Sequence, residues 1–204
     1  MDVLRAMAQE AGLKLSQETA YAQFRGVRMA DCVRWIGTQL QLAPQHFDLD
    51  FTDRVRRAMD ARFRLGLKVI PGAPELLAKL KQPFCVATNG PRAKVELTLT
   101  VSGLRGFFGE RVFSAYELGC FKPDPGLFLH AARALQVEPK RCAVVEDSLT
   151  GIEAGLDAGM TVFSLHPRNR LPPSIAHEVH CIDDLRALDA ILHHETFRVT
   201  ANGD

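Results

Sequence analysis

Residues 142–165, with the sequence CAVVEDSLTGIEAGLDAGMTVFSL, decide the fold class. A short apolar run at 142–146 is followed by a stretch with helical spacing of small residues at 150–158, and then by a second apolar run at 161–165. A strand, a helix and a strand of these lengths predict a right-handed βαβ unit with parallel strands. Helices cover both faces of such a sheet, which explains why its strands are apolar throughout.

The same alternation occupies most of the chain after residue 67. We expect further strands at 84–88, 111–114 and 179–182, and further helices at 71–80, 92–102, 125–135 and 184–192. Residues 68–192 are therefore predicted to form an α/β domain with a Rossmann-like, doubly wound parallel sheet. Ligands of such sheets bind just beyond the carboxyl ends of the strands, so the polar residues that end strands are the candidates for chemistry.

Residues 1–67 have a helical pattern and contain no good strand. We expect helices at 1–11, from Ser16 into 24–26, at 29–40 and from 47–48 through 63. This region is predicted to be a small helical domain that precedes the α/β domain, and residues 193–204 are predicted to be a C-terminal tail. At about 150 residues per domain, 204 residues allow one full domain and a small second one.

Composition excludes several classes of protein. Lys and Arg number 25 against 24 Asp and Glu, and a net charge of +1 gives no global field toward nucleic acid or an anionic membrane. No run of about 18 apolar residues could span a bilayer, and the first residues do not resemble a signal peptide. The five cysteines are odd in number and lack a C-x-x-C pair, which favours reduced thiols. We therefore expect a cytoplasmic monomer without nucleic-acid or membrane partners.

Polar residues that follow two of the predicted strands could bind an anion. Thr88 and Asn89, with Gly90 behind them, offer a hydroxyl, an amide and backbone N–H groups to a phosphoryl group. The alternative is a plain turn, since Asn-Gly is a turn dipeptide. Lys122 is held by the prolines on both sides of Asp124, and a fixed ammonium there could neutralise a phosphate. The alternative is an exposed lysine before a helix that Asp124 caps.

Glu146 and Asp147 follow a buried apolar strand directly. Adjacent carboxylates repel one another and are costly to desolvate unless a cation compensates them. Mg²⁺ binds one or two carboxylates together with substrate phosphate and water, so these two residues are the candidate metal ligands. The alternative is that Asp147 only caps the next turn. The small residues at 151, 154, 155 and 158 are interpreted as packing that helix on the sheet.

Together these motifs resemble the haloacid dehalogenase-like hydrolase superfamily. They are Thr88-Asn-Gly90, Lys122-Pro-Asp-Pro125 and Glu146-Asp-Ser148 with 151–160 behind it. The helical N-terminal region resembles the α-helical cap of the β-phosphoglucomutase and phosphatase branch, and Phe24-Arg-Gly26 resembles a short motif of that cap. The stretches 83–91 and 113–116 look most like bacterial 6-phosphogluconate phosphatase-type members.

The resemblance implies a Mg²⁺-dependent phosphatase that acts on a small phosphorylated metabolite, a sugar or sugar-acid phosphate, through an aspartyl-phosphate. By matching position, Thr88 and Asn89 would bind the phosphoryl oxygens, and Lys122 would neutralise the nucleophile and the phosphate. Asp147 would bind Mg²⁺, with Glu146 as a further or water-mediated ligand.

The family's nucleophile motif, Asp-x-Asp-Gly after the first strand and ahead of the cap, does not occur in this sequence. Asp48-Leu-Asp50 mimics its spacing, but no apolar strand precedes it and no Gly follows, so we interpret it as a helix start with acidic residues in the first turn. One explanation is a truncated chain that lacks a strand and its loop; the other is a natural, non-catalytic descendant. The helix that begins uncapped at Met1 and the joint presence of Lys122, Glu146 and Asp147 favour truncation.

Two other functions remain alternatives. A phosphosugar mutase of the same family carries an Arg shortly after the cap's Gly, where this chain has Met29 with Arg28 out of register. A non-catalytic binding or regulatory module is the second alternative. As written, the chain is not expected to form a phosphoenzyme.

Overall fold

The structure, a computed structural model, describes residues 2–42 and 49–193. The chain divides into two compact units. Unit 1 holds the residues up to Leu67 together with Ala93–Ser102, and unit 2 holds Lys68–Arg92 and the residues from Gly103 on. The placement of Ala93–Ser102 in unit 1 differs from the prediction of one continuous domain over 68–192.

Unit 1 is helical, as the pattern predicts. Its helices are α1 (Asp2–Glu10), α2 (Gln17–Phe24), α3 (Met29–Gln39), α4 (Leu49–Arg64) and most of α6 (Arg92–Val101). The core between them includes Leu4, Ile36 and Val55. Ser16 caps α2, since its side chain accepts a hydrogen bond from the Thr19 backbone N–H at 3.0 Å.

The helix predicted to start at 47–48 is α4, of which the described part begins at Leu49 and carries Asp50 in its first turn. Residues 43–48, and with them Asp48, lie outside the described residues, as do Met1 and 194–204. One contact of α6 within unit 1 is that of the Lys94 ammonium, which lies 5.9 Å from the ring centre of Phe63 in α4.

Unit 2 contains parallel strands at the predicted places. They are β1 (Val86–Thr88), β2 (Val112–Ser114), β3 (Ala143–Glu146), β4 (Thr161–Ser164) and β5 (Val179–Cys181). Within the described residues they are hydrogen-bonded in two groups, β1 with β2 and β3 with β4 and β5. The prediction of parallel strands is confirmed, whereas a single continuous sheet was predicted and two shorter sheets are observed.

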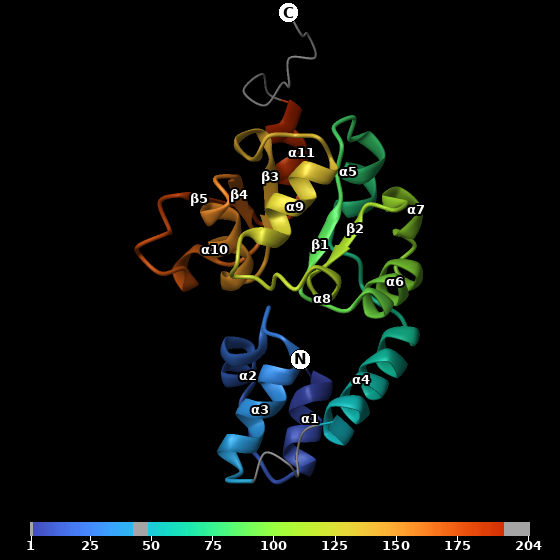
Figure 1. The fold of residues 1–204 in the computed structure, drawn as a ribbon, viewed down its shortest axis with the longest axis vertical. Helices are drawn as coiled ribbons and strands as arrows, with labels where there is room; N and C mark the ends of the chain where they lie inside the picture. Colours follow the sequence, from blue (N-terminus) through green and yellow to red (C-terminus); the bar gives the residue numbers. More distant parts are fainter. Residues whose placement is uncertain (1, 43–48, 194–204) are drawn as a thin grey trace, which may run out of the picture. The chain divides into compact units, whose positions relative to one another are not determined.

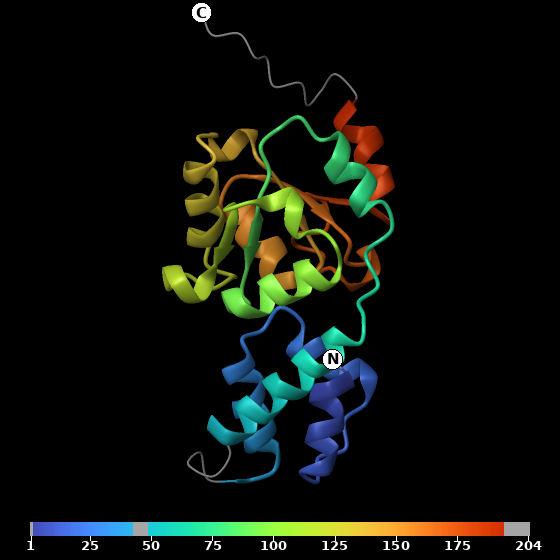
Figure 2. The same ribbon diagram turned by 90° about the vertical axis from the view of Figure 1, so that its right-hand side faces the viewer.

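Helices of unit 2 pack against these strands. They are α5 (Ala73–Lys79), α7 (Arg105–Phe108), α8 (Ala115–Leu118), α9 (Gly126–Ala134), α10 (Leu149–Asp157) and α11 (Leu185–His193), with 3₁₀ turns at Pro139–Arg141 and Arg168–Arg170. Helix α9 packs on β1 and β2, α10 packs on β3 and β4, and α9 and α10 contact one another (Figure 1). Helices α5 and α11 pack side by side (Figure 2).

Helix α10 packs closely on the sheet because Gly155 has no side chain. A Cβ at Gly155 would lie 2.8 Å from Cγ2 of Val162 in β4. The α10 face of β3 is therefore well covered, and Val144 is buried there.

The side chains on the other face of β3 are exposed to solvent. Ala143 is exposed, and Val145 has an exposed fraction of 40% although it is an apolar residue inside the strand. All three residues of β1 are half-buried. A parallel strand is normally buried on both faces, so β1 and β3 both have the exposure of edge strands.

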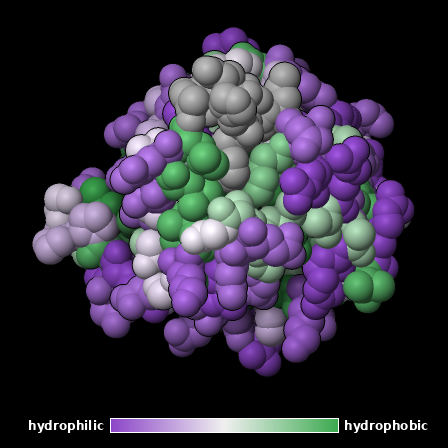
Figure 3. Space-filling view, turned by 90° about the horizontal axis from the view of Figure 1, so that it is seen from below, coloured by the Kyte–Doolittle hydropathy of each residue, from purple (hydrophilic) through white to green (hydrophobic). Residues whose placement is uncertain are grey.

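Hydrophilic side chains cover most of the face drawn in Figure 3, with smaller hydrophobic areas among them. Among the residues that the structure describes, no helix is long and apolar enough to cross a membrane.

Candidate active site

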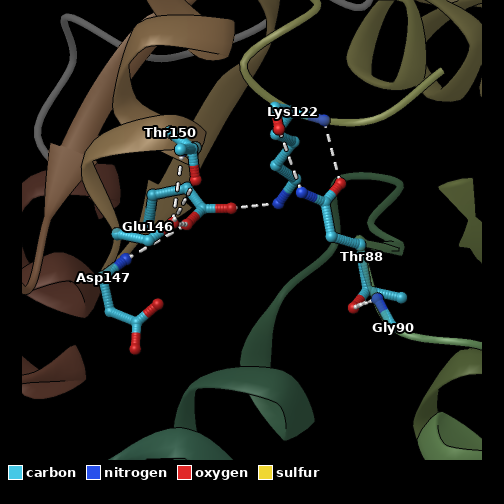
Figure 4. A network of polar contacts seen from close by, with 9 residues as sticks. Thr88, Gly90, Lys122, Glu146, Asp147 and Thr150 are labelled. Atoms are coloured by element: carbon cyan, nitrogen blue, oxygen red, sulfur yellow. Dashed lines mark hydrogen bonds and ion pairs between the residues drawn. The ribbon is translucent and has the colours of Figure 1, made fainter. Parts of the chain in front are cut away.

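A buried ion pair joins Lys122 to the last residue of β3. The Lys122 ammonium contacts Oε1 of Glu146, and the two side chains keep only 7% and 10% of their surface exposed (Figure 4). The ammonium also lies 4.6 Å from the ring centre of Phe128 in α9, close enough for a cation–π contact. The lysine is thus not the exposed residue of the alternative interpretation, because its charge is held inside unit 2.

The second carboxylate oxygen of Glu146 is also hydrogen-bonded. Oε2 accepts a hydrogen bond from the Ser148 hydroxyl at 3.1 Å and one from the Asp147 backbone N–H at 3.3 Å. A buried carboxylate needs such partners, since its desolvation is otherwise uncompensated. Glu146 is therefore fixed on both oxygens, one toward Lys122 and one toward the start of α10.

Gly151 in α10 makes room for this carboxylate. A Cβ at this position would overlap the side-chain carboxyl group of Glu146. Ser148 is the N-cap of the same helix, and its Oγ accepts a hydrogen bond from the Gly151 N–H at 3.2 Å. The first turn of α10 is therefore built around Glu146, so Gly151 does more than the predicted packing on the sheet.

Asn89 follows β1 and is bound to the backbone of Lys122. Its Oδ1 accepts a hydrogen bond from the Lys122 N–H at 2.9 Å, and its Nδ2 donates to the Lys122 carbonyl at 3.1 Å. The two residues are 33 positions apart in sequence. The end of β1 and the end of β3 are consequently linked through one lysine.

Thr88 lies at the carboxyl end of β1, as predicted. Its Oγ1 accepts a hydrogen bond from the Gly90 N–H at 3.0 Å, which shapes the turn after the strand. Ser114, its register partner in β2, donates from Oγ to the Gly90 carbonyl at 2.8 Å. A threonine hydroxyl that accepts one hydrogen bond keeps its own proton available for an anion.

Asp147 differs from Glu146 in its surroundings. It is exposed, and its carboxylate points away from that of Glu146 in Figure 4. Ser148, rather than Asp147, caps the following helix. Within residues 2–42 and 49–193, no group of three or more His, Cys, Asp or Glu side chains gathers in a way that could hold a metal ion.

The structure therefore brings both Asn89 and Glu146 into contact with Lys122. Thr88 and Asp147 lie beside them at the ends of β1 and β3. The sequence interpretation assigned no role to Ser148 or Phe128 and gave Gly151 only a packing role. Ser148 carried a signal, because a serine directly before a helix is a preferred N-cap. Phe128 carried none, since an aromatic residue in a helix is ordinarily a core residue.

Cys85, which directly precedes β1, is not a candidate nucleophile. Burial raises the pKa of the Cys85 thiol to about 11. A thiol with this pKa is protonated at neutral pH and is a poor nucleophile.

Comparison with known proteins places these motifs in a family. A sequence model described as haloacid dehalogenase-like hydrolase matches residues 2–159. The chain belongs to the haloacid dehalogenase-like hydrolase family. The 6-phosphogluconate phosphatase of Escherichia coli is 33% identical to it over 159 residues, which make up 77% of this chain and 70% of that protein.

Solved structures of haloacid dehalogenase-like proteins have the same fold. A conserved protein of unknown function from Agrobacterium tumefaciens matches with a TM-score of 0.77 and 28% identity, covering 94% of this chain and 88% of that one. A family hydrolase from Deinococcus radiodurans, solved with bound phosphate and sodium, matches with a TM-score of 0.68 and 29% identity, covering 94% and 86%. The predicted α/β fold and family membership are confirmed.

Proposed function

We propose that this chain is the phosphate- and metal-binding part of a Mg²⁺-dependent phosphatase that acts on a sugar or sugar-acid phosphate. The observation that carries the proposal is the buried Lys122–Glu146 pair at the carboxyl ends of the strands, with Thr88 and Asp147 beside it. The similarity to a 6-phosphogluconate phosphatase supports the substrate class. Hydrolase family membership supports the reaction type.

Lys122 and Thr88 act on the phosphate in this proposal. The Lys122 ammonium neutralises charge on the phosphoryl oxygens, and the cation is held in place by Glu146 and Phe128. The Thr88 hydroxyl donates a hydrogen bond to a phosphoryl oxygen, and the Gly90 N–H holds that hydroxyl in place by donating a hydrogen bond to its oxygen. Fixed donors of this kind stabilise charge that develops in the transition state at little reorganisation cost.

The donor set fits Mg²⁺ through oxygen ligands. Asp147 offers an exposed carboxylate at a strand end, and a hard cation with few protein carboxylates completes its shell with water and substrate phosphate. Both carboxylate oxygens of Glu146 are already bound, one to Lys122 and one to Ser148. In the proposal Glu146 therefore binds Mg²⁺ through a water molecule. Bound Mg²⁺ would supply further neutralisation of the phosphate charge.

We further propose that the nucleophilic aspartate comes from polypeptide outside these 204 residues. The sequence has no Asp-x-Asp-Gly motif. The separation of β1–β2 from β3–β4–β5, with Val145 exposed, is consistent with an additional strand in the complete catalyst. An aspartyl-phosphate would then form on that strand beside Lys122.

Hydrolysis of p-nitrophenyl phosphate and 6-phosphogluconate tests the proposal. The assay compares the 204-residue chain with a polypeptide extended upstream in the natural reading frame, each with Mg²⁺ and with EDTA. We expect Mg²⁺-dependent phosphate release from the extended polypeptide alone. Activity of the 204-residue chain would refute the proposal that the nucleophile lies outside it. An inactive extended polypeptide would refute the proposed phosphatase function.

A further inference from the structure

Asn89 has a contact pattern that binding to phosphate does not require. Both ends of its carboxamide engage the backbone of one residue, Lys122: Oδ1 accepts from the N–H at 2.9 Å and Nδ2 donates to the carbonyl at 3.1 Å. A carboxamide places one acceptor and one donor side by side, which matches the N–H and C=O of a single residue. A carboxylate or an alkyl side chain cannot make both hydrogen bonds, and a hydroxyl has its donor and its acceptors on a single atom.

The position of Asn89 explains what these hydrogen bonds accomplish. Asn89 directly follows β1, whereas Lys122 lies in the segment between α8 and α9. The loop around Lys122 is thus attached to the end of β1, and the lysine side chain extends from there to Glu146 at the end of β3 (Figure 4). The location of the ammonium depends on where the Lys122 backbone is held.

We propose that Asn89 is a positioning residue that places the Lys122 ammonium, and that it acts on phosphate through Lys122 rather than as a phosphate ligand. This role rests on the proposed function and differs from the direct phosphate contact that the family resemblance implies for Asn89. Without the carboxamide, the Lys122 N–H and carbonyl lose their partner and the ammonium loses its fixed place against Glu146.

The first test observes the Lys122 ammonium by NMR in the 204-residue chain. A lysine ammonium that is buried and hydrogen-bonded exchanges slowly enough to give a ¹H–¹⁵N signal, and the Lys122 signal is assigned by its absence in Lys122→Met. We expect Asn89→Ala to remove or strongly shift this signal while the chain still unfolds cooperatively. Asn169→Ala, at an exposed asparagine of the Arg168–Arg170 turn, is the matched control and leaves the signal unchanged.

Asn89→Asp provides a second variant of almost the same shape. It keeps the acceptor for the Lys122 N–H and replaces the donor with an oxygen that faces the Lys122 carbonyl. We expect the Lys122 signal to shift here as well. A Lys122 signal that is unchanged in both folded variants, with only a lower melting temperature, would overturn the positioning role.

The second test is affinity for inorganic phosphate, measured by titration calorimetry. Asn89→Ala should weaken binding roughly tenfold, the effect of losing the free energy of one to two hydrogen bonds. In a Lys122→Met background the same substitution should change nothing further. An equal loss in both backgrounds would identify Asn89 as a direct ligand and overturn the proposal. If the parent chain binds no phosphate, the proposed function fails, and the ammonium signal still decides the role of Asn89.

Discussion

The ammonium of Lys122 meets the carboxylate of Glu146 where β3 ends, and both side chains are almost completely buried. They come from separate segments, 24 positions apart. Because Asn89 binds the Lys122 backbone and Ser148 binds Glu146, the pair is the centre of a network that joins β1, β3 and α10.

Removing one member of this pair should be costly. Lys122→Ala leaves the Glu146 carboxylate buried without its cation, and we expect a loss of about 3–5 kcal/mol in the free energy of unfolding. Urea denaturation measures this loss. Lys140→Ala removes an exposed lysine that pairs with Glu138, and it should cost less than about 1 kcal/mol. Equal losses in the two variants would show that the buried pair contributes no more to the free energy of unfolding than the exposed pair.

The position of Gly151 should not accept a side chain. Gly151→Ala places a Cβ against the Glu146 carboxyl group, and we expect a loss of about 1–3 kcal/mol from the overpacking. Gly106 in α7 is the control, because a Cβ there would meet nothing within 4 Å. Gly106→Ala should unfold at the same denaturant concentration as the parent chain or a higher one. A neutral Gly151→Ala would contradict the close packing of α10 on Glu146.

Ser148 should contribute more than an ordinary helix cap. Ser148→Ala removes the cap of α10 and a donor to Glu146, whereas Ser16→Ala removes the exposed cap of α2 and an exposed hydrogen bond with the Thr19 hydroxyl. A cap is worth about 1 kcal/mol, so thermal or urea unfolding should show that loss for Ser16→Ala and a larger one for Ser148→Ala. The reverse order would contradict the coupling of the cap to Glu146.

The raised pKa of Cys85, about 11, predicts how its reactivity and stability contribution depend on pH. The folded thiol stays protonated above the ordinary value of 9.0, so the folded state binds more protons than the unfolded state between the two values. The contribution of Cys85 to stability is therefore present below pH 9.0 and is lost as the pH rises toward 11.

Alkylation with iodoacetamide, followed by mass spectrometry of the cysteine peptides, measures this directly. At mildly alkaline pH, Cys85 should react much more slowly in the folded chain than in denaturant. Rapid labelling of Cys85 in the folded chain would contradict the raised pKa.

The strands and their polar ends could be predicted because the signals are local. Each strand is a short apolar run between breakers, and Thr88, Lys122 and Glu146 are polar residues at the ends of such runs or beside prolines. The family resemblance supplied the roles that these residue types alone leave open.

The rest depends on contacts between distant segments. The hydrogen bonds between Asn89 and the Lys122 backbone join residues 33 positions apart, and they correspond to no periodic pattern in the sequence. The division of the strands into two sheets depends on which edges meet, and apolar content alone does not specify this. Helices α7 and α8 have four residues each, too few for a helical period to be recognised.

Calorimetric titration of the 204-residue chain with inorganic phosphate in the presence of Mg²⁺ shows whether Lys122 is the phosphate-binding cation of this unit. We predict saturable binding that Lys122→Met weakens strongly and Lys140→Met leaves intact. No binding by the parent chain, or equal affinity of the parent and Lys122→Met, would contradict the account.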